Sequence, residues 1–186
     1  MFTLVQERPQ DGLTIENLYE AAFGPGRKAR TAERLRENNH PVADYCFIAE
    51  EDGALAGTVR FWPILAGSAG KAGATEGLLL GPLAVQPHRR RNGMGLALVE
   101  AGIARAKEQG VAFVLLVGDE PYYAKAGFVV ADAGRFEMPG PVDATRLLVR
   151  ELNDKGAQAK GAVKANPDEA ELVTFAPPAA QQCAAQ

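Results

Sequence analysis

Residues 78–110 contain an apolar strand, a short basic loop and a long amphipathic helix in direct succession. The helix opens at Gly93-Met94-Gly95. The first turn of a helix exposes backbone N–H groups without an intrahelical partner, and the helix dipole adds about half a positive charge there. Because Gly93 and Gly95 lack a Cβ atom, a phosphate group can approach the backbone closely. The segment therefore predicts an anion-binding site at the start of this helix.

The spacing of the glycines separates this loop from the common nucleotide-binding loops. Residue 91 is not glycine, which rules out the fingerprint Gly-x-Gly-x-x-Gly around Gly93, and no Gly-Lys-Ser/Thr follows as in a Walker A loop. The loop matches Arg/Gln-x-x-Gly-x-Gly/Ala instead, as Arg90-Arg91-Asn92-Gly93-Met94-Gly95.

Two segments together resemble a known family. The stretch GPLAVQPHRRRNGMGLALVEAGIARAKEQG resembles the central motif of the GNAT acyltransferases, and YYAKAGF resembles their later motif, in which a tyrosine stands four residues before a Gly-Phe pair. The segments VGD and LLVREL resemble a bacterial subgroup of uncharacterised acetyltransferases. The resemblance covers about residues 2–152.

The element order agrees with an α/β (α+β) fold. The pattern predicts a strand, two helices (the second over residues 28–38), three strands, a helix, a strand, a short helix and two strands. Pro82 within a strand indicates a bulge or a strand side left unpaired. The resemblance implies a GNAT-like mixed central sheet of about six to seven strands flanked by helices. In it, the parallel strands at residues 78–85 and 112–117 splay apart.

The composition of the chain changes near Asn153. We expect residues 1–152 to form the acyltransferase domain. Alanine, glutamine, lysine and proline dominate residues 153–186, which predicts a low-complexity, mobile C-terminal extension.

The resemblance assigns roles to individual residues. Backbone groups of Leu83, Ala84 and Val85 would meet the pantetheine arm, and an N–H of this strand, that of Val85, would meet the oxyanion. Tyr123 would protonate the leaving thiolate. Asp119, Glu120 and Glu76 are open alternatives for the route of the amine proton. The cofactor-binding residues expected are Leu83, Ala84, Val85, Arg90, Arg91, Asn92, Gly93, Met94 and Gly95.

These assignments predict an N-acetyltransferase that moves an acetyl group from acetyl-CoA to a primary amine, either a small molecule or a peptide. A non-catalytic CoA-binding sensor and an enzyme that uses another acyl-CoA are the alternatives. The net charge of −3 does not favour nucleic acid or a membrane surface as a partner. Cysteine and histidine are too few and too scattered for a metal site. A cytoplasmic location is expected, and a homodimer is left open.

Overall fold

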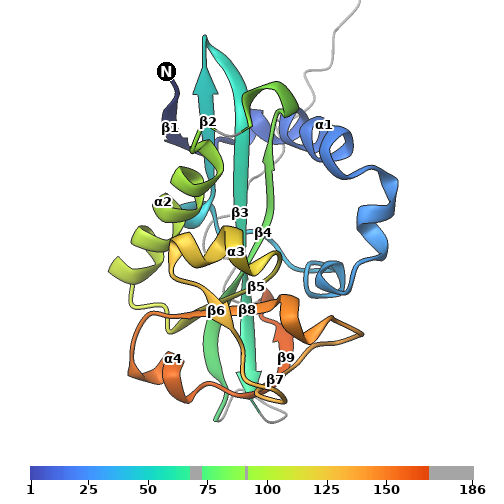
Figure 1. Ribbon diagram of the computed structural model, residues 1–186, viewed down its shortest axis with the longest axis vertical. Helices are drawn as coiled ribbons and strands as arrows, with labels where there is room; N and C mark the ends of the chain where they lie inside the picture. Colours follow the sequence, from blue (N-terminus) through green and yellow to red (C-terminus); the bar gives the residue numbers. More distant parts are fainter. Residues whose placement is uncertain (68–72, 91, 168–186) are drawn as a thin grey trace, which may run out of the picture.

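The computed structural model describes residues 1–67, 73–90 and 92–167 of the 186-residue chain. These residues form one mixed sheet whose main path runs β1-β2-β3-β4-β5-β8-β6, while β9 pairs with both β3 and β7 (Figure 1). The pairs β4–β5 and β7–β9 are parallel, and the others are antiparallel. The mixed sheet is therefore confirmed, and β7 and β9 extend it beyond the six to seven strands expected. The strands are β1 (Thr3–Gln6), β2 (Phe47–Glu51), β3 (Ala54–Gly67), β4 (Thr75–Val85), β5 (Phe113–Val117), β6 (Val129–Val130), β7 (Phe136–Glu137), β8 (Leu147–Glu151) and β9 (Gly161–Ala165).

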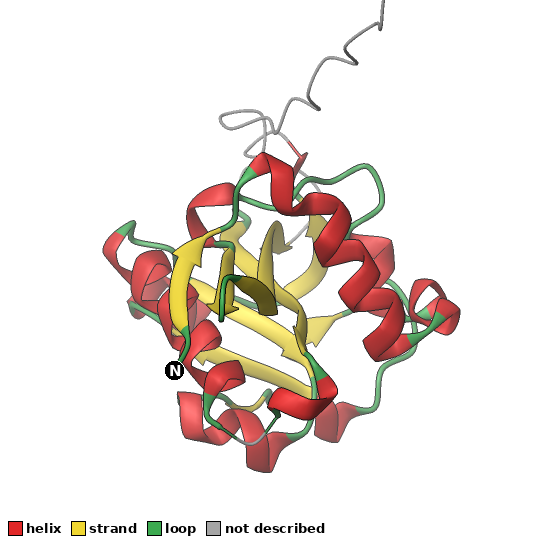
Figure 2. Cartoon of the chain, turned by 90° about the horizontal axis from the view of Figure 1, so that it is seen from above, coloured by secondary structure: helices red, strands yellow, loops and turns green. Residues whose placement is uncertain are grey.

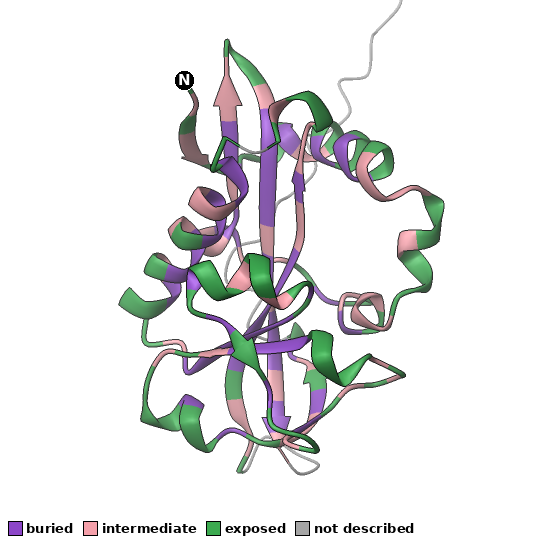
Figure 3. Cartoon of the chain, viewed as in Figure 1, coloured by how far each residue is buried: buried purple, intermediate pink, exposed green. Residues whose placement is uncertain are grey.

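Helices cover both faces of this sheet (Figure 2). They are α1 (Gly12–Phe23), α2 (Met94–Glu108), the short α3 (Glu120–Tyr123) and α4 (Asp154–Gln158). Successive residues of β4 alternate between two cores: Leu78 and Leu80 pack with α2, whereas Leu79 packs with Phe113 on the other face. Figure 3 shows the resulting pattern, with buried residues along the central strands and exposed residues on the outer sides of the helices. None of the helices in the described ranges is long and apolar enough to span a membrane.

The second helix expected over residues 28–38 is wrong. The chain forms two 3-10 turns there, η2 (Pro25–Ala29) and η3 (Thr31–Leu35), separated by Arg30 in an extended conformation (φ −75°, ψ 145°). Of these two turns, only Leu35 is buried, so a regular helix would gain little from packing. Side chains instead tie η3 to a distant loop: Thr31 Oγ1 donates to Pro141 O (2.5 Å), and Arg34 Nη1 donates to Pro139 O (2.6 Å).

A bulge interrupts β4 at Gly81-Pro82. The register with β3 shifts between Val59, opposite Leu83, and Phe61, opposite Leu80, so β4 carries one extra residue. This confirms the bulge alternative for Pro82.

Beyond the bulge, β4 parts from β5. The paired positions of these parallel strands are Leu78 with Val114 and Leu79 with Leu115. β4 then continues to Val85 and β5 to Val117 with no further pairing between them in the described chain. The expected splay is present, and it opens a gap beside the second half of β4.

The mobile extension expected from residue 153 is wrong for residues 153–167. Helix α4 packs beside β5, and β9 pairs with the end of β3 from Ile64 to Gly67. The partner strand β2 reaches β3 only as far as Val59, so it leaves this edge open for β9. Val163 is buried there, although one large apolar residue in a run of alanine, glycine and lysine gives a weak signal in the sequence. Residues 168–186 lie outside the described chain.

Replacing Gly156 with alanine tests the packing of α4. A Cβ atom at this position would lie 1.9 Å from the carbonyl oxygen of Ala112, which is backbone and cannot rotate away. We expect Gly156→Ala to lower the free energy of unfolding by about 1–3 kcal/mol, measured by urea denaturation. Gly12→Ala is the control, since Gly12 has no heavy atom within 4 Å of the added Cβ. Equal stability of both variants would contradict the packing of α4 on β5.

Candidate functional site

A cavity of about 810 Å³ lies beside the second half of β4 and the start of α2. Every predicted cofactor-binding residue that the structure describes lines it, and Arg91 lies outside the described residues. Further lining comes from positions that the sequence patterns did not single out for this site, namely Ala22, Phe23, Leu96 and Lys125. Ala22 and Phe23 are the last residues of α1. The sequence feature that could have indicated them is the apolar end of this helix directly before Gly24-Pro25.

Gly93 is the N-cap of α2 and has the left-handed conformation (φ +82°). This conformation favours glycine, and the residues of the first helical turn, Met94, Gly95 and Leu96, line the cavity. One N–H group of this turn is occupied: Met94 N donates to Asn92 Oδ1 (3.1 Å). The helix dipole and the remaining N–H groups of the first turn still favour an anion at this end.

The free edge of β4 supplies a second set of backbone groups. Gln86 N donates to Ala56 O (2.9 Å), which places residue 86 in a hydrogen-bonded pair with β3. Since such pairs alternate along an antiparallel ladder, the N–H and C=O groups of Val85 and Leu83 point away from β3. The same alternation turns the backbone groups of Ala84 toward β3. The edge facing the gap is therefore formed by Leu83 and Val85.

The two described arginines of the loop, Arg89 and Arg90, have different partners. Arg89 forms ion pairs with Glu51 and Asp52 at the β2–β3 turn, which holds its guanidinium away from the cavity. Arg90 lines the cavity, and its Nε donates to Val85 O (3.3 Å). Of the described arginines in this run, Arg90 is the one positioned to meet an anion at the start of α2.

Tyr123 lies where the first cavity meets a second one of about 630 Å³, because it lines both. Its ring packs against Gly118, where an added Cβ would lie 2.4 Å from Tyr123 Cε2, and it meets Phe128 edge to face. Burial raises the pKa of Tyr123 well above its usual value, and the neighbouring Tyr122 and Asp119 act in the same direction. The phenol is therefore protonated at neutral pH and can donate a proton. Tyr122, the alternative tyrosine, lines the first cavity but not the second.

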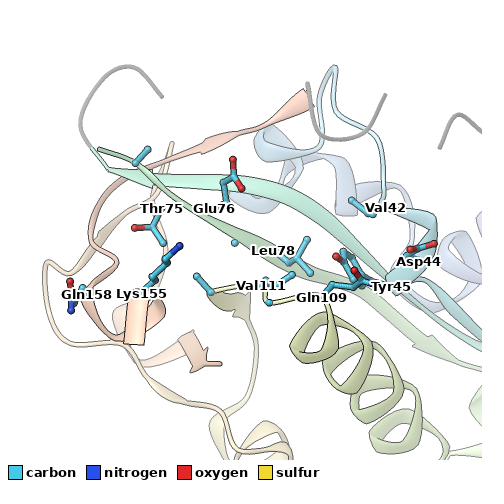
Figure 4. Close-up of a pocket in the computed structure, with 14 residues that line it drawn as sticks. Val42, Asp44, Tyr45, Thr75, Glu76, Leu78, Gln109, Val111, Lys155 and Gln158 are labelled. Carbon is cyan, nitrogen blue, oxygen red and sulfur yellow. The ribbon is translucent and has the colours of Figure 1, made fainter. Parts of the chain in front are cut away.

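The three carboxylates considered for the amine proton have different positions. Asp119 lines both cavities, directly before α3. Glu120 lines neither. Glu76 lies in a separate cavity of about 620 Å³ between the C-terminal end of α2, the start of β4 and α4, together with Asp44 and Lys155 (Figure 4). The geometry therefore favours Asp119.

Close contact between Gly95 and Tyr122 gives a test of this cavity. A Cβ atom at Gly95 would lie 2.3 Å from the Tyr122 hydroxyl oxygen, while the next atom of that ring is 3.6 Å away. Gly95→Ala should push the tyrosine into the cavity and weaken acetyl-CoA binding about tenfold, measured as Kd. Adding Tyr122→Phe removes the clashing oxygen, so the double variant should recover most of the affinity. If the double variant binds no better than Gly95→Ala, the contact is not the cause.

Within the described ranges, no group of three or more His, Cys, Asp or Glu side chains is placed to hold a metal ion. Cys46 is buried, and its Sγ donates to Val42 O (3.2 Å), away from both cavities.

Known proteins resemble this chain in sequence and in structure. The uncharacterized N-acetyltransferase YhbS of Escherichia coli (strain K12) is 27% identical over 148 residues, covering 80% of this chain and 86% of that protein. The crystal structure of E. coli YhbS, determined in complex with CoA, superposes with a TM-score of 0.74 at 25% identity and covers 89% of each chain. An acetyltransferase of Brucella melitensis in complex with acetyl-CoA gives a TM-score of 0.57 at 29% identity, covering 81% of this chain and 96% of that one.

The family model described as the acetyltransferase (GNAT) family matches residues 13–128, which are more than half of the chain. The motif residues around Gly93 and the Tyr123-to-Gly127 segment both fall within this match. By sequence and by fold, the chain belongs to the GNAT acetyltransferase family.

Proposed function

We propose that this protein transfers an acetyl group from acetyl-CoA to a primary amine by direct attack. The observation that carries the proposal is that two cavities share Tyr123 in their walls. One cavity has the helix start and strand edge suited to a long phosphorylated thioester, and the other is open to a second substrate. The structure of YhbS contains CoA and that of the Brucella enzyme contains acetyl-CoA, which supports acetyl-CoA as the acetyl donor here.

The cofactor cavity has groups that fit the parts of acetyl-CoA. The first turn of α2, from Gly93 to Gly95, would hold the pyrophosphate with its N–H groups, and Arg90 would add a cation. The outward backbone groups of Leu83 and the outward C=O of Val85 would pair with the amides of the pantetheine arm, as an added strand pairs with a sheet edge. The thioester would then lie in the gap between β4 and β5.

Transfer needs three groups around the thioester carbon. The amine nitrogen attacks that carbon, and the N–H of Val85 stabilises the charge that develops on the carbonyl oxygen. Tyr123 donates its proton to the sulfur as the C–S bond breaks. Asp119 takes up the proton that the amine loses, through water, because its side chain is exposed at the junction. The protein forms no covalent bond with the acetyl group in this scheme.

The direct test is release of free thiol from acetyl-CoA in the presence of an amine panel. We expect thiol release that depends on the amine and saturates with it. Acetyl-CoA binding without release for any amine would instead identify a sensor. Faster release from succinyl- or malonyl-CoA than from acetyl-CoA would show that the acyl group has been assigned wrongly.

A further inference from the structure

The second cavity, which lies beyond Tyr123, has an unusual charge distribution. Four arginines line it, three from residues 27–36 and one from a distant turn: Arg27, Arg30, Arg36 and Arg146. Three carboxylates also line it, and all three are engaged within the protein: Glu33 pairs with Arg36. Asp143 accepts hydrogen bonds from the N–H and hydroxyl groups of Thr145, and Asp119 pairs with Arg146 at 3.2 Å.

Arg36 lies deepest among these arginines. Its side chain is 12% exposed, its guanidinium lies 5.8 Å from the centre of the Trp62 ring, and its Nη2 lies against Gly81, at the bulge of β4. Trp62 Nε1 in turn donates to Gly81 O (2.7 Å). Arg36 is therefore fixed beside the bulge, between η3 and the strand that carries the free edge.

Part of the Arg36 guanidinium has no partner. Nη1 pairs with Glu33, whereas Nε is buried without a hydrogen-bond partner and Nη2 makes no hydrogen bond within the described chain. Burial lowers the pKa of Arg36, although a guanidinium stays charged at any physiological pH. A buried cation with an unused donor is costly, and an anion that approaches Nη2 from the cavity would offset part of that cost.

Arg30 provides a second positive charge without a carboxylate partner. Its guanidinium lies over the Phe23 ring at 5.5 Å, and no carboxylate of the described ranges forms an ion pair with it. Phe23 lines both cavities, so Arg30 lies toward the junction, whereas Arg36 lies at the bulge. An amine acceptor without an anionic group would meet only repulsion from these two side chains.

We infer that the second cavity takes a small amine acceptor that carries a carboxylate, with Arg36 as the residue that binds this carboxylate. The inference rests on the proposed acetyl transfer and names the acceptor class for it. Nη2 makes no hydrogen bond within the described chain, so its N–H groups can donate to a carboxylate oxygen, and the charge of the guanidinium strengthens that bond. A volume of about 630 Å³ suits a small molecule. The amino group would point toward Tyr123 and the thioester.

The test compares amino acids with their neutral amides, which have nearly the same shape but no negative charge. With acetyl-CoA, the wild type should use the acids with a kcat/KM about tenfold or more above that of the amides, as expected for a hydrogen bond to a charged group. Arg36→Gln should bring this ratio close to one, mainly through KM for the acids. Lys28→Gln, an exposed charge on η2 outside both cavities, should leave the ratio unchanged.

The outcomes separate this inference from the proposed function. Equal use of acids and amides by the wild type would overturn the carboxylate assignment and leave acetyl transfer standing. No thiol release with any amine would remove acetyl transfer itself. If neutral amines react only with succinyl-CoA, and Arg36→Gln removes that reaction, the carboxylate belongs to the acyl group and the acceptor assignment is wrong. An unchanged Kd for acetyl-CoA in Arg36→Gln shows that the variant is folded.

Discussion

Replacing Tyr123 with phenylalanine should lower kcat about 10²- to 10⁴-fold and leave the Kd of acetyl-CoA unchanged. The hydroxyl lies on a ring that lines both cavities, and it would protonate the leaving sulfur. Burial raises the pKa of Tyr123, so the phenol keeps its proton at the alkaline pH where more of the amine is the free base. Without this proton the thiolate must leave as an anion, which slows the breaking of the C–S bond.

A matched variant separates this chemistry from the general effect of removing a hydroxyl group. Tyr45→Phe makes the same change in the separate cavity near α4, and it should leave kcat unaffected. Steady-state rates and calorimetric Kd values would be measured for both variants. A Tyr123→Phe enzyme with normal kcat and normal binding would show that another group, or water, supplies the proton.

Replacing Gly93 with aspartate should weaken acetyl-CoA binding by at least about 100-fold. The carboxylate would stand at the helix start where the pyrophosphate is expected. Two unit charges about 4 Å apart repel by about 4 kcal/mol at an effective dielectric constant of 20, and solvent reduces this at an open site. The left-handed backbone at Gly93 (φ +82°) adds strain for any side chain.

Gly93→Asn separates the charge from the strain. Asparagine tolerates the left-handed conformation better than most residues and carries no charge, so its Kd should stay much closer to that of the wild type. Equal losses for the aspartate and asparagine variants would place the effect in the backbone, and wild-type affinity for the aspartate variant would mean that the pyrophosphate binds elsewhere.

Local sequence patterns predicted the central part of the fold and the residues gathered beside it. Glycines at residues 93 and 95 before an apolar helix, and Pro82 within an apolar strand, each have a direct conformational consequence. The helix start and the bulge followed from them, whereas the splayed strands were implied by the family resemblance. Gly93 and Gly95 line one cavity together with Leu83 and Val85, because these residues are close in sequence and lie on adjoining elements.

Features that depend on distant contacts could not be predicted in this way. Residues 28–38 have helical spacing, but loop contacts near Pro139 and the lack of buried side chains leave them as 3-10 turns. Strand β9 has one large apolar residue, Val163, among glycine, alanine and lysine, and it pairs with the edge of β3 that β2 leaves open. The charge of the acceptor could not be predicted from the sequence, because the first 40 residues carry charges of both signs. Only the fold brings Arg36 and Arg146 to one cavity.

The most direct test of the central claim is a calorimetric titration of the wild-type protein with acetyl-CoA and, separately, with acetyl-pantetheine, which has the thioester but no pyrophosphate. Saturable binding of one acetyl-CoA per chain, with much weaker binding of acetyl-pantetheine, is the predicted result. Equal affinity for both compounds, or no binding of acetyl-CoA by folded protein, would contradict a pyrophosphate site at the start of α2.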